Sequence, residues 1–79
     1  MREEDTLARA VRRDLELIRE KIISHRVDLG LGQEDMAKLC GLSKTMYGDL
    51  ERGKRSLSVE HVLRIHHTAR LDLNLLFSL

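Results

Sequence analysis

The sequence predicts an all-α fold built from five helices. Apolar residues recur along the chain at the three- and four-residue spacing of helices, and no strand-like alternation is present. Proline is absent from the 79 residues, which favours long uninterrupted helices. Hydrophobic residues make up 42% and charged residues 34%, which is typical of a folded globular domain and not of a disordered chain. A chain of this length fits one domain.

A long first helix is predicted over residues 4–29. Five apolar residues recur at steps of four, four, three and four, which places them on one helical face. They are Leu7, Val11, Leu15, Ile18 and Ile22. Gly30 and Gly32 are expected to end this helix, because glycine adopts the left-handed conformation that terminates helices. We expect residues 1–17 to form a helical extension and residues 18–79 to form the compact domain.

Two short helices are predicted next, at Gln33–Cys40 and from Ser43 to Arg52. Gly41 is expected to end the first, and Ser43 to cap the second, because its hydroxyl can accept a hydrogen bond from a free backbone N–H. Gly53 is expected to end the second. The residues expected to face inward from these two helices are Met36, Ala37, Leu39, Cys40, Tyr47 and Leu50.

Two further helices complete the prediction. Ser58 is expected to cap a fourth helix that runs to about Arg70, and Asp72 is expected to cap a short last helix. The inward candidates of the fourth helix are Val62, Leu63, Ile65 and Ala69. The apolar residues of the last helix are Leu73, Leu76 and Phe77.

Two short helices separated by a Gly-Leu-Ser turn are typical of a helix-turn-helix. Residues 18–77 resemble the Cro and lambda-repressor type of DNA-binding domain, the XRE family. The resemblance rests on Arg26 and on the joint order of LGLGQEDMAKLCGLS (Leu29–Ser43), LERGKR (Leu50–Arg55) and LDLNLLF (Leu71–Phe77). It implies a compact five-helix lambda-repressor-like domain, here with an extended first helix, that binds double-stranded DNA.

The resemblance implies a DNA-contacting set centred on a recognition helix, Ser43–Arg52, in the major groove. The first turn of this helix would present Lys44 to a guanine or a phosphate and Thr45 to a base edge. Because the formal net charge is only +1, attraction to DNA must come from locally placed cations such as Lys54 and Arg55. The full implied set is Gln33, Ser43, Lys44, Thr45, Met46, Gly48, Asp49, Arg52, Lys54, Arg55 and Ser58.

Two acids in this region receive separate interpretations. Asp49 is either a solvent-facing acid or cap partner that meets no base, or a residue that accepts a hydrogen bond from cytosine N4 or orients Lys44 or Arg52. Glu51 is implied by the resemblance to form an internal ion pair with Arg26. That pair would fix the recognition helix and neutralise the carboxylate, so that it does not repel DNA.

The remaining implied contacts and departures concern helix ends and the core. Gln33 and Ser58, each at the start of a helix, are implied phosphate ligands. Gly32 stands where the family usually has a Ser or Thr N-cap, and Arg70 stands where glycine is common. Tyr47 replaces a buried aliphatic residue, so its hydroxyl is expected to reach a hydrogen-bond partner or solvent.

The resemblance leads to a sequence-specific transcriptional regulator, a repressor that acts as a homodimer on a palindromic operator. A restriction-modification controller, or an antitoxin whose partner protein is a toxin, is an alternative within this class. An alternative of another class is a protein-interaction domain of the same fold that no longer binds DNA. The dimer surface is expected on the last helix, with help from the first. Its expected residues are Leu73, Leu75, Leu76, Phe77 and Leu79.

Other functional classes find no support in the sequence. Apolar runs of only a few residues exclude a transmembrane span or signal peptide, so we expect a cytoplasmic, nucleoid-associated protein of a bacterium or phage without a membrane partner. The single cysteine, Cys40, excludes an internal disulfide and is interpreted as a core residue. The histidines lack the spacing of a metal site and no catalytic arrangement is present, so we expect no enzyme activity, cofactor, metal or small-molecule ligand.

Overall fold

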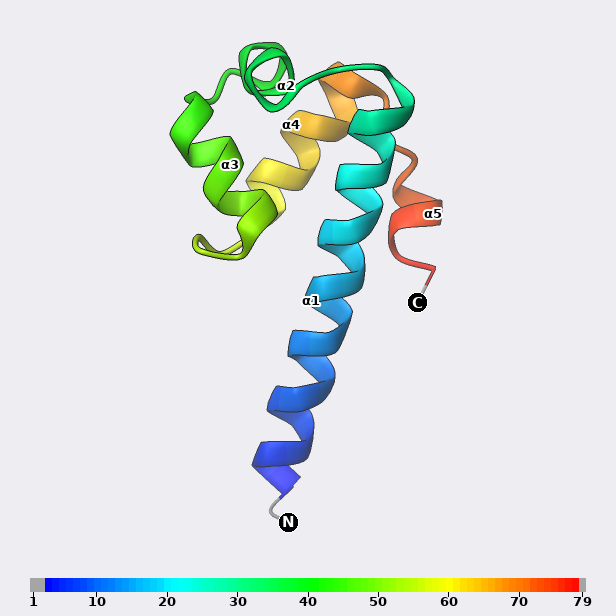
Figure 1. Ribbon diagram of the computed structural model, residues 1–79. Coiled ribbons are helices and arrows are strands. Elements are labelled where there is room, and N and C mark those ends of the chain that lie inside the picture. The colour runs from blue at the N-terminus through cyan, green and yellow to red at the C-terminus, as the bar shows by residue number, and fades with distance from the viewer. Residues whose placement is uncertain (1–2, 79) are drawn as a thin grey trace.

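Helices form all the regular secondary structure in the part of the chain that the computed structural model describes, residues 3–78. Five helices lie in this range (Figure 1). They are α1 (Glu3–Asp28), α2 (Gln33–Cys40), α3 (Lys44–Arg52), α4 (Val59–Ala69) and α5 (Leu73–Leu76). The predicted all-α class is confirmed, and the predicted bounds of the first four helices differ from the observed ones by at most one residue.

The predicted apolar face of α1 divides into a buried part and an exposed part. Ile18 and Ile22 are 8% and 3% exposed and belong to the core, whereas Leu7 and Val11 are 65% and 48% exposed. Figure 1 shows the reason, because only the C-terminal half of α1 runs beside the other helices. The helix is continuous, so the predicted N-terminal extension is part of α1 itself.

The helix-turn-helix consists of α2, a turn at Gly41, and α3. Gly41 has a φ of 71°, a left-handed conformation that a side chain would strain, and its N–H donates to the carbonyl of Lys38 at 3.2 Å. The Oγ of Ser43 accepts a hydrogen bond from the N–H of Met46 at 3.0 Å, so the predicted cap of α3 is confirmed. Gly32 precedes α2 without a side-chain cap, since glycine has no hydroxyl to offer.

The last two helices begin at the predicted caps. Ser58 and His61 form a reciprocal capping box at the start of α4, and Asp72 accepts backbone N–H bonds at the start of α5. Lys21 on α1 donates through Nζ to the carbonyl of Leu75 at 2.9 Å. This bond fastens the short α5 against α1, and the two helices lie close together in Figure 1.

The turn between α4 and α5 holds an arginine in a conformation that favours glycine. Arg70 has a φ of 58°, which lies in the left-handed region. This arginine is the residue that stands where glycine is common in the family. Two histidine rings brace the turn, with His25 Nε2 2.6 Å from the Ala69 carbonyl and His66 Nδ1 2.6 Å from the Leu71 carbonyl. The turn therefore keeps the helix-ending geometry without glycine.

The core lies where the C-terminal half of α1 meets the other helices. Its buried apolar members are Ile18, Ile22, Met36, Ala37, Cys40, Tyr47, Leu50, Val62, Ile65, Ala69, Leu71 and Leu76. Two predicted inward residues are wrong, because Leu39 and Leu63 are 42% and 41% exposed. Each lies roughly 110° or more around its helix from the mean direction of that helix's buried residues, since successive residues turn by about 100°.

Candidate nucleic-acid interface

Helix α3 has one anchored face and one free face. Tyr47 and Leu50 are 1% and 3% exposed and hold the helix in the core. In the first turn, Lys44 and Thr45 are exposed and Met46 is half-buried. A helix that is anchored on one side and polar and free in its first turn has the arrangement needed to read the major groove.

An ion pair between α1 and α3 fixes the orientation of α3. Arg26 donates to Glu51 through Nε at 2.7 Å and through Nη2 at 3.2 Å, and its Nη1 donates to the carbonyl of Leu31 at 2.8 Å. The side chains of Arg26 and Glu51 are only 14% and 5% exposed. The geometry is bidentate, which adds directional constraint to the attraction of the charges.

Gln33 joins this ion pair from the start of α2. Its Nε2 donates to Glu51 Oε1 at 2.9 Å, a contact that the sequence did not indicate. Burial alone would raise the pKa of Glu51, but the interactions with Arg26, Tyr47 and Gln33 outweigh burial and keep this pKa below its usual value. Gln33 therefore ties α2 to α3, and its contact with a DNA phosphate stays a prediction.

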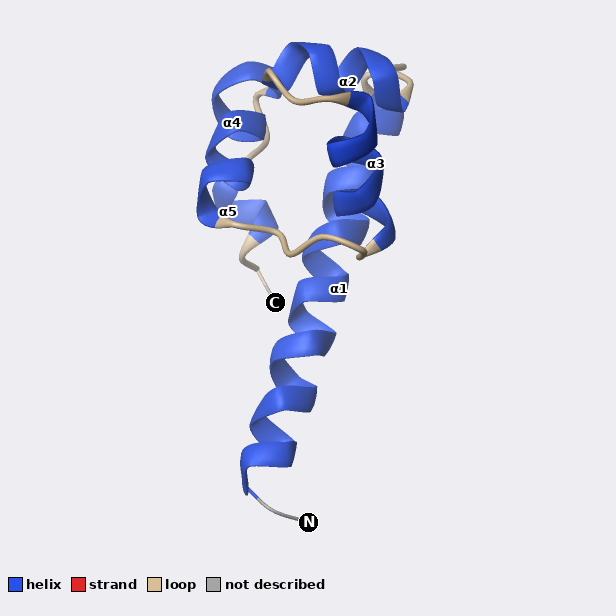
Figure 2. Ribbon diagram, turned by 90° about the vertical axis from the view of Figure 1, so that its left-hand side faces the viewer, coloured by secondary structure: helices blue, strands red, loops and turns tan. Residues whose placement is uncertain are grey.

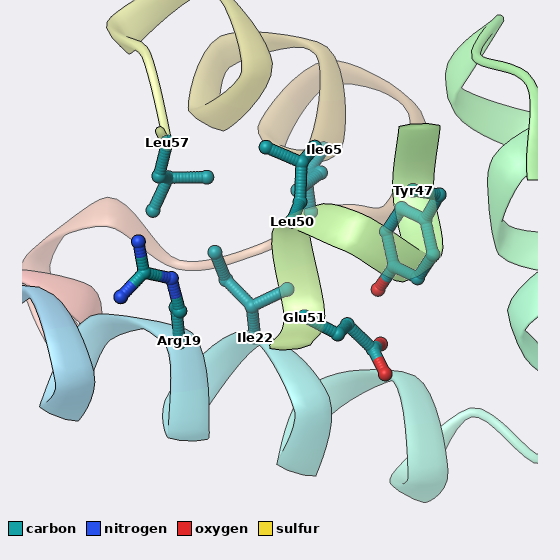
Figure 3. Close-up of a pocket in the computed structure, with 7 residues that line it drawn as sticks. All are labelled: Arg19, Ile22, Tyr47, Leu50, Glu51, Leu57 and Ile65. Carbon is teal, nitrogen blue, oxygen red and sulfur yellow. The ribbon is translucent and has the colours of Figure 1, made fainter. Parts of the chain in front are cut away.

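The hydroxyl of Tyr47 is buried beside this network. Figure 3 shows the ring entering the core with its oxygen directed toward the side of Glu51. Among the described residues the hydroxyl makes no hydrogen bond of standard geometry, but it interacts with the Glu51 carboxylate, which is the partner available to it. The carboxylate already accepts bonds from Arg26 and Gln33. Burial and the neighbouring carboxylate raise the pKa of Tyr47, so the hydroxyl stays protonated.

Asp49 and Arg52 form a local ion pair on the exposed side of α3. Arg52 Nη2 donates to Asp49 Oδ1 at 2.9 Å, and the two side chains are 50% and 25% exposed, respectively. Gly48 lies beneath the guanidinium and is buried, because a Cβ at this position would be 2.9 Å from Arg52 Nη2. Gly48 is therefore covered in this structure and does not lie on an open groove-facing surface. Of the roles predicted for Asp49, the structure shows the one in which it orients Arg52.

The basic loop that follows α3 is fastened to the helix by its backbone. The N–H groups of Lys54 and Arg55 donate to the Asp49 carbonyl at 2.9 and 3.2 Å, while both side chains are exposed. Arg19 of α1 supports the loop, because its Cζ is 3.6 Å from the position of a Cβ on Gly53. The helical pattern placed Arg19 outside the apolar face of α1, and no local signal indicated this contact.

The predicted dimer residues fall into three groups. Leu75 and Phe77 are 63% and 57% exposed, and Leu73 is half-buried. Leu76 is fully buried, at 0% exposure, so its expected place on an interface is wrong: α5 turns this side chain into the core of its own chain. Leu79 lies outside the described residues.

The comparison with protein families gives one match, to the Helix-turn-helix model HTH_3, over residues 22–76. The chain belongs to the XRE-type helix-turn-helix family. The matched range contains α2 to α5 and the part of α1 that packs on them, and it confirms the resemblance seen in the sequence. Comparisons with curated proteins and with solved structures each gave no match. This helix-turn-helix protein is accordingly a DNA-binding regulator of a family that is typically non-enzymatic.

Two further properties concern metals and membranes. Among the residues whose side chains the structure describes, 5–78, no three or more His, Cys, Asp or Glu side chains are grouped as ligands for a metal ion. Over the same range, none of the helices combines the length and the apolarity that crossing a bilayer requires. Cys40 is buried as a free cysteine, with its Sγ 3.4 Å from the hydroxyl oxygen of Thr68.

Proposed function

We propose that this protein is a sequence-specific transcriptional repressor that binds a palindromic operator as a homodimer, with α3 in the major groove. The observation that carries the proposal is the fixed presentation of α3. The core and the Arg26–Glu51 pair hold its inner side, while Lys44 and Thr45 stay exposed. A rigid helix with a free polar first turn can distinguish base pairs, because each presents its own hydrogen-bond pattern in the major groove. Occupying promoter DNA would block polymerase.

Base contacts and phosphate contacts are assigned to different parts of this surface. Lys44 can donate to guanine O6 or N7, Thr45 can bond a base edge, and Met46 can contact a thymine methyl group. Lys54 and Arg55 are exposed beside α3 and are assigned to the phosphate backbone. The helix N-termini at Gln33 and Ser58 are further phosphate ligands in this proposal. Specificity and general affinity are thus separable by mutation.

The homodimer follows from the limited reach of one recognition helix. A single helix contacts few bases, and a two-fold dimer sets two such helices about 34 Å apart, one turn of DNA. The exposed Leu75 and Phe77, with the half-buried Leu73, give the C-terminal region an apolar surface for this contact.

Salt-dependent DNA binding tests the proposal. Sites are selected from random double-stranded DNA, and affinity for them is measured by fluorescence anisotropy over a range of salt. The variant with Lys54→Ala and Arg55→Ala should lose affinity for all sequences alike, and its slope of log K against log salt should fall by about 2. Arg9→Ala with Arg13→Ala removes the same charge from an exposed part of α1 and should leave the slope unchanged.

A second candidate is a protein-interaction domain that kept the fold and lost DNA binding. The Asp49–Arg52 pair favours it, because the pair neutralises a cation on the exposed side of α3. This candidate predicts no binding to any DNA at low salt, a result that would refute the regulator. The controller and antitoxin alternatives share the DNA surface with the repressor, and a co-encoded methylase with a nuclease, or a bound toxin, would identify them.

A further inference from the structure

The N-terminal part of α1 projects beyond the rest of the molecule. We call residues 3–14 the arm. Figures 1 and 2, seen from directions 90° apart, both show the arm extending clear of the other helices. Its side chains Leu7 and Val11 are 65% and 48% exposed. A helix of about 12 residues is only marginally stable alone in water, and packing of an apolar face is what usually stabilises it. The apolar face of the arm therefore calls for a partner surface.

The total exposed area gives the size of that partner surface. The accessible surface is 5532 Å² for a chain of 9.1 kDa, whereas a compact monomer of this mass exposes about 4,900 Å². The excess of about 600 Å² approaches the roughly 800 Å² per partner that a standard protein–protein interface covers. The extra surface is thus of the size that a second subunit buries.

A second apolar surface, which we call the groove, lies where the arm joins the domain. It is lined mainly by apolar side chains of α1, α4 and the C-terminal region, including Leu15, Val59, Leu63, Leu73 and Phe77. Val59 and Phe77 are 74% and 57% exposed. Leu15 follows Leu7 and Val11 at helical spacing, so the apolar face of the arm continues directly into the groove.

We propose that a second copy of this chain covers both surfaces, with the arm of each copy packed in the groove of the other. Leu7 lies eight residues before Leu15, about 12 Å along the helix. Two antiparallel α1 helices with a two-fold axis near Val11 therefore bring Leu7 of one copy opposite Leu15 of the other. In such an isologous interface every contact occurs twice, so both arms and both grooves are covered at once. The inference rests on the homodimer of the proposed function and names its surface, but it requires no DNA.

The oligomeric state of the full chain without DNA tests this interface. Sedimentation equilibrium should give twice the 9.1 kDa chain mass for the wild type. The variant with Leu7→Glu and Val11→Glu should be monomeric, because two carboxylates cannot be buried unpaired in an apolar groove. Val27→Glu is the matched control, since Val27 is 59% exposed on the same helix but lies outside the arm, and this variant should stay dimeric.

Two outcomes would overturn the proposal. The wild type could be monomeric at every concentration tested, or the Leu7→Glu, Val11→Glu variant could remain dimeric. In the second case, dissociation of the dimer by Leu75→Glu would place the interface on α5 without the arm.

Disulfide trapping tests the register in a protein that keeps its apolar arm. In Val11→Cys the two introduced cysteines face each other at the two-fold axis and should form a cross-linked dimer under mild oxidation. Arg13→Cys, at a position on the other side of the arm, should remain a single chain on a non-reducing gel. Cys40 is 2% exposed and should form no cross-link. Equal cross-linking of the two variants, or none in Val11→Cys, would refute the arrangement.

This inference and the proposed function fail in different ways. A wild-type dimer that depends on Leu7 and Val11 but binds no DNA would support the interface and refute the regulator. A protein that binds its selected DNA while the Leu7→Glu, Val11→Glu variant stays dimeric would support the regulator and refute the interface.

Discussion

Replacing Arg26 with methionine removes one half of the ion pair that holds α3 and keeps an unbranched side chain in its place. Glu51 would lose hydrogen bonds of 2.7 and 3.2 Å and retain the one from Gln33 at 2.9 Å. Its side chain is 5% exposed, so the carboxylate would become an uncompensated buried charge, which costs about 3–5 kcal/mol. A domain of 79 residues is stable by roughly 4–12 kcal/mol. Arg26→Met should therefore remove a large part of the free energy of unfolding.

The loss should depend on pH, because it arises from a charged carboxylate. In the wild type the folded-state pKa of Glu51 is depressed, since the interactions with Arg26, Tyr47 and Gln33 outweigh burial. This depression contributes stability that is full above the unfolded pKa and is lost as pH falls through the folded pKa. Without Arg26, burial should raise the folded-state pKa of Glu51 above its unfolded-state pKa. Protonation of Glu51 would then remove the buried charge and reduce the loss of stability in the variant. The difference in stability should be widest near about pH 7 and should narrow toward about pH 4.

Urea denaturation followed by far-UV circular dichroism at the two pH values measures this difference. Glu51→Gln and the double variant with Arg26→Met complete a thermodynamic cycle. The double variant should lose less free energy of unfolding than the two single variants lose in sum, because it leaves no buried charge. A loss below about 1 kcal/mol at neutral pH, the size expected of an exposed pair, would refute the reasoning. A loss that does not change with pH would refute it as well.

Three other substitutions test the recognition helix. Asp49→Ala removes the 2.9 Å bond to Arg52 and should change the preference at one operator position by about 1–3 kcal/mol, measured by competition between operator variants. Gly48→Ala places a Cβ 2.9 Å from Arg52 Nη2, so it should displace the guanidinium while stabilising α3 by at most about 1 kcal/mol. If both variants change the base preference alike, Arg52 is the residue that contacts the base. If only Asp49→Ala changes the base preference, Asp49 is the residue that contacts the base. Ser43→Ala removes the cap on the Met46 N–H and should lower the free energy of unfolding by about 1 kcal/mol in urea, whereas unchanged stability would show that the cap contributes nothing.

The ends of α2 and α3 were predictable because helix caps act locally. The Ser43 hydroxyl accepts a hydrogen bond from a backbone N–H three residues ahead. Gly41 and Gly53 adopt the left-handed conformation, with φ angles of 71° and 77°. These effects need no knowledge of the rest of the fold. The Arg26–Glu51 pair joins helices that are far apart in the sequence, so the residues by themselves could not indicate it, and it followed from the family resemblance alone.

The remaining contacts were not predictable because they depend on how helices pack. Leu39 and Leu63 lie at the edge of their apolar stripes, and only the position of the neighbouring helices decides that each is exposed. Gln33 reaches Glu51 because α2 and α3 meet at a particular angle. Arg19 is charged and lies outside the apolar face of α1, yet its side chain is only 14% exposed and supports the loop at Gly53. Helical periodicity contains no information on such contacts.

Asp49 is the feature of α3 that stands most clearly against DNA binding, since an acid repels phosphates. In the structure its charge is met by Arg52, and the absence of a side chain on Gly48 leaves room for the guanidinium to lie across the helix. The three residues therefore act as one unit in which acid and cation compensate each other. Removing the acid should do more than remove repulsion, because it frees Arg52 to reach a phosphate. We expect Asp49→Ala to bind unrelated DNA more tightly than the wild type while discriminating less between operators, and weaker binding to unrelated DNA would contradict this reasoning.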